Sequence, residues 1–558
     1  MEKKWIVQKS LGKEEIHSLS QKWSISPLMV QLLHNRGVRK EIRKFLYPCR
    51  EDLYNPFLMK GMEEAIQVIL RTIHKQKKIL IYGDYDVDGI TATSLLLLFL
   101  REIKANVYFY IPKRESEGYG LNKEAIDKAL QKKISLIITC DCGISSFKEV
   151  EYAKSKGLEI IITDHHFPED PLPSCIILDP EQSDCPYPFK KLAGVGVAFK
   201  LIQGLSERFS YKKIEVTKYL DLVAIGTIAD IVPLKDENRT LVKLGLECLR
   251  KTNNVGLKAL INVSSLSGKK IGEREIGFIL APRINACGRL SLAVKGVRLL
   301  LSTSFGEAHK LAQELNKENI SRQRLQEEIC REAEEILPKE KDPIILLYKK
   351  GWHPGVIGLV ASYIKEKYFR PTFIFSLDGK NARGSARSIP SFSVFDALKE
   401  CEDLLISFGG HKMAAGMEVS LENIEKLRER LNYIAYKSLS PSDFIPSLLI
   451  DTRINLEELE EKIFEELELL SPYGVENPLP LFLTTDLSIS SFRKVRKGYM
   501  KISLCSPGGK RFEGIGFNLK SDEIKAPNRV DIIFSPQINY QGGRKLYQLN
   551  IKDYRERN

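Results

Sequence analysis

Three aspartates at alternate positions, Asp84, Asp86 and Asp88, follow the apolar run "KKILIY" (77–82). At pH 7 their carboxylates repel one another, and burying even one of them is costly without a partner. Clusters of this kind persist where a bound cation compensates the charge. A solvated turn is the alternative, because aspartate and glycine are also common in loops. This stretch alone leaves both interpretations open.

Further candidate ligands come at the ends of other apolar runs. They are Asp141, Asp164, His165, His166 and Asp230. Each has an ordinary structural explanation when taken singly: an aspartate after a strand is often a turn or cap residue, and a histidine pair often lies at the surface. Five such residues at the ends of successive elements are harder to explain as coincidence. We therefore ask which fold would bring these ends together.

From residue 77 onward, short apolar runs alternate with amphipathic stretches. The expected strands cover 77–82, 106–111, 135–140, 158–163 and 175–180, and the expected helices cover 90–103, 122–133 and 145–157. This alternation predicts an α/β fold with a doubly wound parallel sheet. In such sheets ligands bind beyond the carboxyl ends of the strands, which is where the acids and histidines fall.

Carboxylates together with imidazole are the ligands expected for Mn²⁺ or Mg²⁺, and Mn²⁺ tolerates the nitrogen ligand better. The set also exceeds the needs of one ion. It suits two divalent cations about 3.5–4 Å apart that share a bridging carboxylate, an arrangement used for attack on phosphorus. The sequence therefore predicts two divalent cations, with Mn²⁺ preferred over Mg²⁺.

Four short motifs, "DYDVDG", "DCG", "DHH" and "ADIVPL", resemble in order and spacing those of the DHH phosphoesterase superfamily. Later motifs are similar to those of the RecJ family of single-strand-specific 5′→3′ exonucleases. These are "APRINACGRL" (281–290), "GWHPGVIGLVASYIKEKYFRP" (351–371), "RGSARS" (383–388) and "GGHKMAAG" (409–416). The resemblance covers nearly the whole chain and implies a DHH domain, a DHHA1 domain and an OB fold.

The resemblance also implies roles for individual residues. The metal ligands would be Asp86, Asp88, Asp141, His165 and Asp230, with Asp141 bridging the two ions. His166 would face the scissile phosphate, and Asp141 and Asp164 would share the catalytic site with it.

One position departs from the superfamily pattern. Many members have a histidine ligand four residues before the first ligating aspartate, where this chain has Tyr82. We expect one ion to have a thinner protein shell and to bind more weakly. Asp84 is a possible substitute ligand.

The middle of the chain predicts a linking helix over 304–338, and a packed helical hairpin is the alternative. The following lobe carries glycines among Arg, Ser and His residues, which favours phosphate binding although glycine turns would look similar. In light of the resemblance, this lobe is interpreted as a clamp on the 5′ end, in a groove between two lobes. The expected substrate-binding residues are Arg114, Arg283, Asn285, Arg289, His353, Ser385, Arg387, Gly410 and His411.

The C-terminal part begins with an acidic amphipathic helix expected over 455–470 and continues with alternating strands at 499–505 and 546–554. Alternation with glycine turns suggests a small β-barrel. No acid occurs from Leu487 to Phe512, and basic residues interleaved with aromatics there suit single-strand binding. A solvated hairpin is the alternative. The candidate nucleic-acid contacts are Arg493, Arg496, Lys497, Tyr499 and Lys501.

These patterns give a fold class and domain limits. We expect an α/β chain with a doubly wound DHH lobe, a linking helix, a second α/β lobe and a C-terminal β-barrel. The expected limits are 1–55 for an N-terminal segment, 56–303 for the DHH domain, 304–338 for the linking helix, 339–440 for the DHHA1 domain and 441–558 for the OB domain.

Composition agrees with a nucleic-acid enzyme. The 558 residues are 43% hydrophobic and carry a net charge of +13, which favours a polyanionic partner. Ten cysteines include no CxxC pair, which fits a reducing compartment rather than a disulfide framework or zinc site. The N-terminus has no secretion signal, and the longest apolar run (94–100) is too short to span a bilayer. We expect a soluble, cytoplasmic protein with no membrane contact.

The expected function is a metal-dependent 5′→3′ exonuclease that degrades single-stranded DNA to mononucleotides in recombination and repair. One alternative is a phosphodiesterase for short oligonucleotides or cyclic dinucleotides, although the long chain and basic β-domain argue against a small substrate. A second is a non-catalytic strand-binding replication scaffold, against which the intact acids argue. The resemblance implies single-strand-binding protein and a helicase as partners, and a monomeric state.

Overall fold

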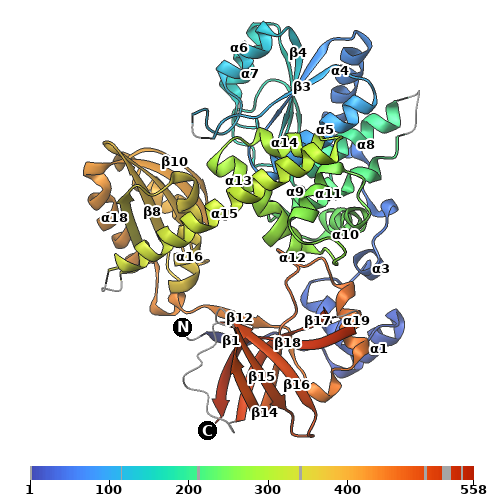
Figure 1. Ribbon diagram of the computed structural model, residues 1–558, viewed down its shortest axis with the longest axis vertical. Coiled ribbons are helices and arrows are strands. Elements are labelled where there is room, and N and C mark those ends of the chain that lie inside the picture. Colours follow the sequence, from blue (N-terminus) through green and yellow to red (C-terminus); the bar gives the residue numbers. More distant parts are fainter. Residues whose placement is uncertain are drawn as a thin grey trace. The chain divides into compact units, whose positions relative to one another are not determined.

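The computed structural model describes residues 3–114, 116–209, 214–338, 342–495, 499–517, 529–541 and 544–557 (Figure 1). The chain forms two compact units. The larger unit consists of Trp5–Ala281, Val297–Ala308 and Leu449–Asn558, and the smaller unit of Met1–Lys4, Pro282–Gly296 and His309–Leu448.

The larger unit contains a five-stranded sheet in which all neighbouring strands are parallel. Its order is β3 (Val107–Tyr110), β2 (Lys78–Gly83), β4 (Ile134–Cys140), β5 (Glu159–Thr163) and β6 (Ile176–Leu178). All five expected strands are present. The direction of winding reverses between β2 and β4, because β3 lies on the other side of β2. This reversal opens the crevice at which ligands bind in doubly wound sheets.

Helices cover both faces of this sheet, as the doubly wound prediction requires (Figure 1). One face packs against α6 (Lys123–Gln131) and α7 (Phe147–Ser155). The other packs against α4 (Met62–His74), α5 (Val87–Glu102) and α8 (Gly194–Arg208). Because α5 lies between the sheet and further helices, it is buried almost all round, which explains why apolar and small residues make up most of its sequence.

A helical region extends the larger unit beyond the sheet. It begins with α9 (Leu220–Ala229), which packs against both α5 and α10. The other helices of this region are α10 (Asp236–Arg250), α11 (Val255–Val263) and α12 (Glu273–Glu275). The next helix, α13 (Ala281–Leu290), belongs to the smaller unit from Pro282 onward, and α14 (Val294–Leu301) returns to the larger unit at Val297.

The expected linking element is one helix, α15 (Phe305–Glu335), so the hairpin alternative is wrong. Its first four residues belong to the larger unit and the rest to the smaller unit. The smaller unit has a mixed sheet in the order β10 (Leu405–His411), β11 (Ala414–Ser420), β9 (Asn381–Arg387), β8 (Thr372–Asp378) and β7 (Ile345–Lys350).

Alternate residues of this second sheet face different helices, as the period of a strand dictates. Ile345 and Leu347 pack towards α16 (Pro354–Tyr368), whereas Leu346 packs with α17 (Val394–Lys399) and α18 (Ile424–Ser438). The resulting lobe is the second α/β unit predicted from the sequence.

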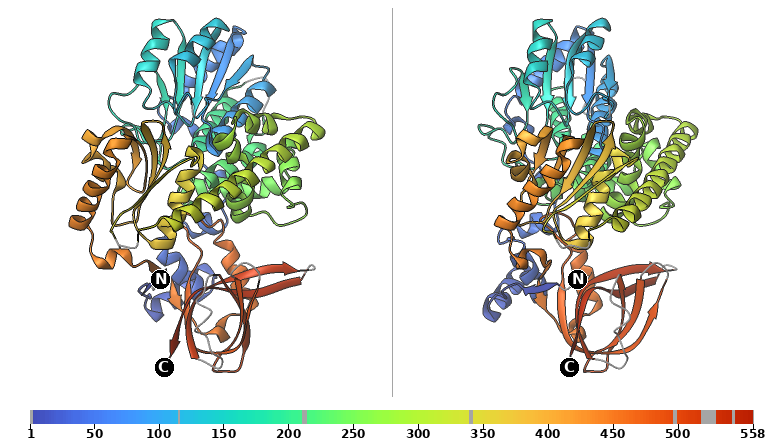
Figure 2. Two further views of the ribbon diagram at one scale, coloured as in Figure 1. Left: turned by 60° about the vertical axis from the view of Figure 1, so that its left-hand side comes forward. Right: turned by 90° about the vertical axis from the view of Figure 1, so that its left-hand side faces the viewer.

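The C-terminal strands close into a β-barrel, because β14 pairs with both β15 and β17 (Figure 2). The barrel strands are β14 (Phe482–Lys494), β15 (Tyr499–Cys505), β16 (Arg511–Phe517), β17 (Arg529–Gln541) and β18 (Arg544–Arg557). The short β13 (Thr452–Arg453) pairs with β14 outside this ring. A separate two-stranded sheet contains β1 (Lys4–Val7) and β12 (Ser447–Ile450). The predicted OB-type barrel is thus confirmed.

The N-terminal segment shares one hydrophobic core with this barrel. Its helices are α1 (Lys13–Trp23), α2 (Pro27–Asn35) and α3 (Ile42–Leu46). The acidic helix was expected to start at 455, but α19 covers only Glu461–Leu469. Leu456 and Leu459 are both buried in the core, and the extended backbone of Glu460 separates them from the helix. Across the described ranges, no helix has the length and apolarity needed to cross a bilayer.

Candidate metal centre

The predicted ligands come from four chain segments that end at the reversal point of the parallel sheet. Asp84 and Asp86 follow β2, Asp141 follows β4, and His165 follows β5. Asp230 is the C-terminal cap of α9, which packs across α5. The fold therefore brings together residues that are up to about 150 positions apart in the sequence.

Two helix N-termini point towards the aspartates of the first motif. Asp86 is the N-cap of α5, where its side chain accepts a hydrogen bond from Gly89 N at 3.0 Å. Asp88 accepts hydrogen bonds from Gly194 N at 2.6 Å and Val195 N at 2.9 Å, at the start of α8. The exposed N–H groups and the helix dipole both favour a negative charge there.

His165 lies in the middle of the carboxylates. Its Nε2 atom is 3.1 Å from Asp141 Oδ1, 3.6 Å from Asp230 Oδ2 and 3.9 Å from Asp88 Oδ2. Burial lowers the pKa of this imidazole, so the neutral ring that ligates metals is favoured. One nitrogen surrounded by three carboxylate oxygens is a typical donor set for a divalent cation.

Three overlapping groups of donor atoms, each within 4.8 Å of one another, occur among the described residues. They are Asp84 with Asp86 and Asp141, Asp88 with His165 and Asp230, and Asp141 with His165 and His166. Asp141 belongs to two of these groups, which is the position that a bridging ligand needs. Asp84, weighed from the sequence as a possible substitute ligand, lies in the first group.

The electrostatics of this cluster call for compensating positive charge. Burial, and then repulsion from neighbouring carboxylates, raises the pKa of Asp84, Asp88 and Asp141 well above that of a free aspartate. Burial also raises the pKa of Asp230, although the histidines work against this shift. Within the described residues, four buried atoms of this cluster form no hydrogen bond of acceptable geometry, although two of them, His165 Nε2 and Asp141 Oδ1, lie 3.1 Å apart. They are Asp84 Oδ1, Asp141 Oδ1, His165 Nε2 and Asp230 Oδ2. Unpaired buried polar atoms are costly, so these residues fit divalent cations.

His166 has a different environment from His165. Its Nδ1 is 2.7 Å from Asp164 Oδ1 and 3.1 Å from the Tyr119 hydroxyl. Burial opposes protonation, but the hydrogen bond with Asp164 and the charges of Asp164, Asp230 and Asp86 together outweigh it and raise the pKa of His166 to about 9. Burial would raise the pKa of Asp164, yet the hydrogen bond from His166 and the charge of that ring lower it. The structure thus pairs an ionised Asp164 with a cationic His166 at the edge of the cluster.

Close backbone approach and backbone strain also mark this site. A Cβ atom at Gly194 would lie 2.7 Å from Asp141 Cβ, and one at Gly226 would lie 2.8 Å from Asp88 Oδ1. Asp141 (φ 61°) and Ile231 (φ 63°) adopt the left-handed conformation, which is unusual for a β-branched residue such as Ile231. Such strain clusters at functional sites.

Sequence reasoning missed Gly194, Gly226 and Tyr119. Gly226 interrupts an apolar helix and Gly194 begins one. A glycine at such a position is a signal for close approach, although the sequence does not indicate which group approaches. Tyr119 carries no comparable signal, because it reaches His166 only through the fold.

Tyr82 does not reach the donor groups. Its buried hydroxyl donates a hydrogen bond to Gly120 O at 2.8 Å and accepts one from Asn122 Nδ2 at 3.1 Å. Its ring stacks on Tyr110 with centroids 5.6 Å apart. The phenol is therefore part of the core on the other face of the sheet. That one ion binds more weakly stays a prediction.

Arg114 lies near the first motif, because its guanidinium is 5.1 Å from the ring centre of Tyr85. Tyr85 stands between Asp84 and Asp86 in the sequence. Of the predicted substrate-binding residues, Arg114 is the one that belongs to the larger unit.

In the smaller unit, four predicted residues gather at the start of α16. His353 is the N-cap and accepts a hydrogen bond from Gly355 N at 3.0 Å. Arg289 donates a hydrogen bond to Gly355 O at 3.2 Å. A Cβ atom at Gly358 would lie 3.0 Å from Ser385 Oγ and 3.2 Å from Arg387 Nη2. Two arginines and a hydroxyl near a helix N-terminus suit a phosphate group.

The remaining predicted residues of the smaller unit lie on neighbouring elements. Across three adjacent strands, His411 pairs with Ala414 and Ala414 pairs with Arg387, so this row shares one face of the sheet. Gly410 precedes His411 with φ 142°, and a Cβ atom there would lie only 2.4 Å from Ala414 O. On α13, Arg283 donates a hydrogen bond to Asn316 Oδ1 at 3.0 Å, and Asn285 is half-buried.

In the barrel, Arg493 and Lys501 stand opposite each other on β14 and β15, and Tyr499 is exposed. Lys501 forms an ion pair with Glu513 at 2.9 Å, which reduces its free charge. Arg496 and Lys497 lie outside the described residues. The barrel's role as a strand-binding surface stays a prediction.

Comparison with known protein families agrees with this architecture. The chain matches the DHH family N-terminal domain over residues 78–227, the DHHA1 domain over 341–437 and the RecJ OB domain over 450–553. The DHH match contains the residues of the metal centre from Asp84 to His166. The DHHA1 match contains α16 and the strands beside it.

Whole-length relatives include the single-stranded-DNA-specific exonuclease RecJ of Bacillus subtilis, which is 42% identical over 99% of this chain and 70% of that protein. The Escherichia coli RecJ is 33% identical over 95% of this chain and 94% of that protein. The crystal structure of Thermus thermophilus RecJ with Mn²⁺ has a TM-score of 0.87 at 31% identity, covering 100% of this chain and 80% of that chain. The same protein with Mg²⁺ gives 0.81 at 29% identity, covering 100% and 79%.

Proposed function

Because the chain belongs to the RecJ family of single-stranded-DNA-specific exonucleases, we propose that it removes 5′-mononucleotides in the 5′→3′ direction by a two-metal hydrolysis of the terminal phosphodiester bond. The observation that carries this mechanism is the set of four buried, unpaired donor atoms on Asp84, Asp141, His165 and Asp230. Their surroundings disfavour the ionised carboxylates that the chain places there, and divalent cations remove that penalty.

Two cations are proposed, with Mn²⁺ preferred because His165 offers a nitrogen ligand. Asp84 and Asp86 would hold one ion, and Asp88, His165 and Asp230 the other, with Asp141 shared. Bound there, the ions would polarise the phosphodiester and lower the pKa of a water molecule, so that a nucleophile forms near neutral pH.

The protein residues around the ions have their own proposed tasks. Asp164 holds Nδ1 of His166 and keeps the imidazole protonated, so Nε2 is left to donate to a phosphate oxygen as negative charge develops. Tyr119 fixes the same ring through its hydroxyl and also donates to Asp141 O at 3.1 Å. His166 is therefore the catalytic group, and Asp164 and Tyr119 position it.

The direction of cutting is proposed to come from the smaller unit. Arg289, Ser385 and Arg387, together with His353 and the α16 N-terminus, would bind the phosphate at the 5′ end. Arg283, Asn285, Gly410 and His411 would extend this clamp, and Arg114 would contact the strand beside the metals. A clamp specific for a chain end makes the enzyme an exonuclease rather than an endonuclease.

Several further points belong to the same proposal. The domain limits are proposed at 55/56, 303/304, 338/339 and 440/441. The barrel would bind the strand away from the cut. The RecJ relatives named above come from bacteria, so we place the protein in the bacterial cytoplasm, where it would act as a monomer in DNA recombination and repair. Single-strand-binding protein and a helicase are the proposed protein partners.

The test is a hydrolysis assay on an oligonucleotide labelled in turn at the 5′ end, at the 3′ end and internally, with Mn²⁺, Mg²⁺ or EDTA. Asp141→Asn removes the shared ligand, and Asp221→Asn is a matched control. Asp221 is also a buried acid of the same domain, but it is bonded to Thr252 and is absent from the donor groups.

The proposal expects metal-dependent release of the 5′ label first, no cutting of a blunt duplex, and loss of activity in Asp141→Asn but not in Asp221→Asn. Early release of the 3′ label would overturn the direction. Cleavage of only the shortest strands would favour a small-substrate phosphodiesterase, and tight binding without cutting in any metal would favour a scaffold.

A further inference from the structure

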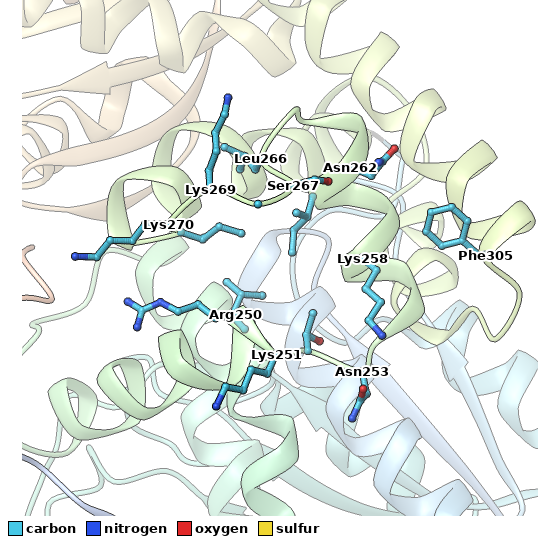
Figure 3. A pocket seen from close by; sticks show the side chains of 15 residues that line it. Arg250, Lys251, Asn253, Lys258, Asn262, Leu266, Ser267, Lys269, Lys270 and Phe305 are labelled. Atoms are coloured by element: carbon cyan, nitrogen blue, oxygen red, sulfur yellow. The ribbon is translucent and has the colours of Figure 1, made fainter. Parts of the chain in front are cut away.

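A basic pocket lies in the helical region of the larger unit, formed by the end of α10, by α11, by the loop that follows it and by the start of α15 (Figure 3). Its volume is about 940 Å³. Five of its lining residues are cations: Arg250, Lys251, Lys258, Lys269 and Lys270. Buried apolar side chains such as Leu249 and Leu266 form part of its wall.

Little of this positive charge is compensated. The lining residues include no aspartate or glutamate. Lys270 forms an ion pair with Glu468 at 2.7 Å, but within the described ranges no ion pair is found for Arg250, Lys251, Lys258 or Lys269. A concave surface with one sign of charge concentrates the electrostatic field and attracts polyanions.

The other lining groups match a nucleotide better than they match a simple anion. Phe305 is 50% exposed and lies across the pocket from Arg250 and Lys270 in Figure 3. Asn253 and Asn262 add amide donors and acceptors. Cations for phosphates and an exposed ring for base stacking are the combination with which proteins hold single strands.

The pocket is separate from the metal centre. Thr252, in its lining, donates a hydrogen bond to Asp221 Oδ2 at 2.5 Å. Asp221 lies in the first turn of α9, whereas the metal ligand Asp230 caps the other end of that helix. Ten helical residues separate these ends by about 15 Å, so the nucleotide being cut does not reach the pocket.

We propose that this pocket is a second strand-binding site, which holds single-stranded DNA several nucleotides away from the bond that is cut. The proposal rests on the proposed function, because it takes the bound strand to be the substrate. It assigns to the helical region of the larger unit and the start of α15 a strand contact outside the catalytic residues. An acidic peptide shares the charge of a DNA strand but makes less use of Phe305 and the amides.

The test compares the full chain with a pocket variant, Lys251→Gln/Lys258→Gln/Lys269→Gln. A matched control, Lys75→Gln/Lys77→Gln/Lys148→Gln, removes the same charge from exposed lysines of the same domain that do not line the pocket. Binding of a long and a short oligothymidine is measured by fluorescence anisotropy in EDTA over a range of salt concentrations. Hydrolysis of both strands is then measured in Mn²⁺.

The pocket variant is expected to bind the long strand more weakly than the control does. Its plot of log K against log salt should be shallower by about 2, since each phosphate contact on a single strand contributes about 0.7. The value of kcat/KM should fall for the long strand, whereas hydrolysis of the short strand should be unchanged. A pocket variant that matches the control in affinity, salt slope and long-strand hydrolysis would overturn the proposal.

A second measurement does not depend on the variant's folding. A long strand carrying 5-iodouracil is cross-linked to the wild-type chain, and the labelled peptides are identified by mass spectrometry. A labelled peptide that contains Phe305 is expected, and its absence when other peptides are labelled would contradict the proposal.

Two other outcomes would change the assignment. If an acidic peptide binds the pocket and the lysine substitutions leave the affinity for the DNA strand unchanged, the pocket belongs to a protein partner. Pocket-dependent binding without hydrolysis in any metal would instead refute the nuclease and leave this site standing.

Discussion

Arg239 is expected to hold the DHH domain to the C-terminal part of the larger unit. The side chain projects from α10 and is 1% exposed. Its guanidinium lies 3.9 Å from the ring centre of Phe45. It also donates hydrogen bonds to five backbone carbonyl oxygens: those of Phe45, Leu469, Leu470, Ser471 and Pro472. One residue thus joins the helical region, the N-terminal segment and the chain that leads into the barrel.

The change Arg239→Lys keeps the charge, so the cost of burying a cation is retained and the effect of geometry is isolated. Three of the five carbonyls have another donor, since Lys243 bonds to Leu469 O and Asn477 bonds to Leu470 O and Pro472 O. For Phe45 O and Ser471 O, Arg239 is the one donor found among the described residues. They bind different nitrogens of the fork, Nε and Nη2, which a single ammonium group cannot replace.

The expected cost follows from these contacts. One buried carbonyl that loses its donor costs about 1–3 kcal/mol. The stacked contact with Phe45 contributes about 1–2 kcal/mol when it is desolvated. The free energy of unfolding should therefore fall by roughly 2–5 kcal/mol in total. Because the unfolding entropy grows with size, this lowers Tm by roughly 2–6 °C for a unit of about 400 residues.

Differential scanning calorimetry in EDTA measures the shift, with Arg101→Lys as the control. Arg101 is an exposed arginine near the end of α5, and its side chain forms no hydrogen bond or ion pair within the described ranges. Limited proteolysis should also cut the Arg239→Lys chain faster near residues 469–472. Equal Tm values for the two variants would refute the carbonyl argument, because the exposed site loses no buried contact.

Three further predictions concern the metal centre. Mn²⁺ at about 100 times its dissociation constant should stabilise the wild-type chain by about 2.7 kcal/mol and leave the Tm of Asp141→Asn nearly unchanged, as followed by thermal unfolding. Without metal, the stability should fall as the pH rises above about 4, the pKa of an unfolded aspartate. The carboxyls of Asp84 and Asp88 have raised pKa values and bind more protons in the folded state than in the unfolded state. Urea titrations in EDTA should show that slope, and saturating Mn²⁺ should remove it. Tyr82→Phe should cost about 1–2 kcal/mol through the lost bond to Gly120 O, yet leave Mn²⁺ affinity by calorimetry unchanged.

The parallel sheet of the larger unit shows which features local sequence patterns can predict. Apolar runs followed by acids predicted the strands and placed Asp86, Asp141 and His165 at one edge, because parallel strands share the direction of their carboxyl ends. The patterns did not give the order of the strands. Tertiary packing decides that β2 lies between β3 and β4, and no local pattern in the sequence indicates this order.

Long-range contacts account for most of what the sequence did not reveal. The sequence set residues 1–55 apart as a segment but gave them no place in the fold, since partners of this segment lie about 400 positions away. Asn35 Nδ2 donates to Asp451 O at 2.9 Å, and Arg36 bonds to Asp451 and Asn477. Likewise, the helix expected from 455 is shortened because Leu456 and Leu459 are drawn into the core that the N-terminal helices share with the barrel.

Without bound cations, the residues of the metal centre destabilise the folded chain. Helix N-termini at α5 and α8 supply N–H donors to Asp86 and Asp88, and each such interaction favours a carboxylate by about 1 kcal/mol. Burial still raises the pKa of Asp88 well above its usual value, so the donors do not offset the desolvation. Asp141 adds a left-handed backbone and an unpaired oxygen. A site with these three costs is favourable only when cations occupy it, so the same features that weaken the metal-free chain are those that make its ions bind.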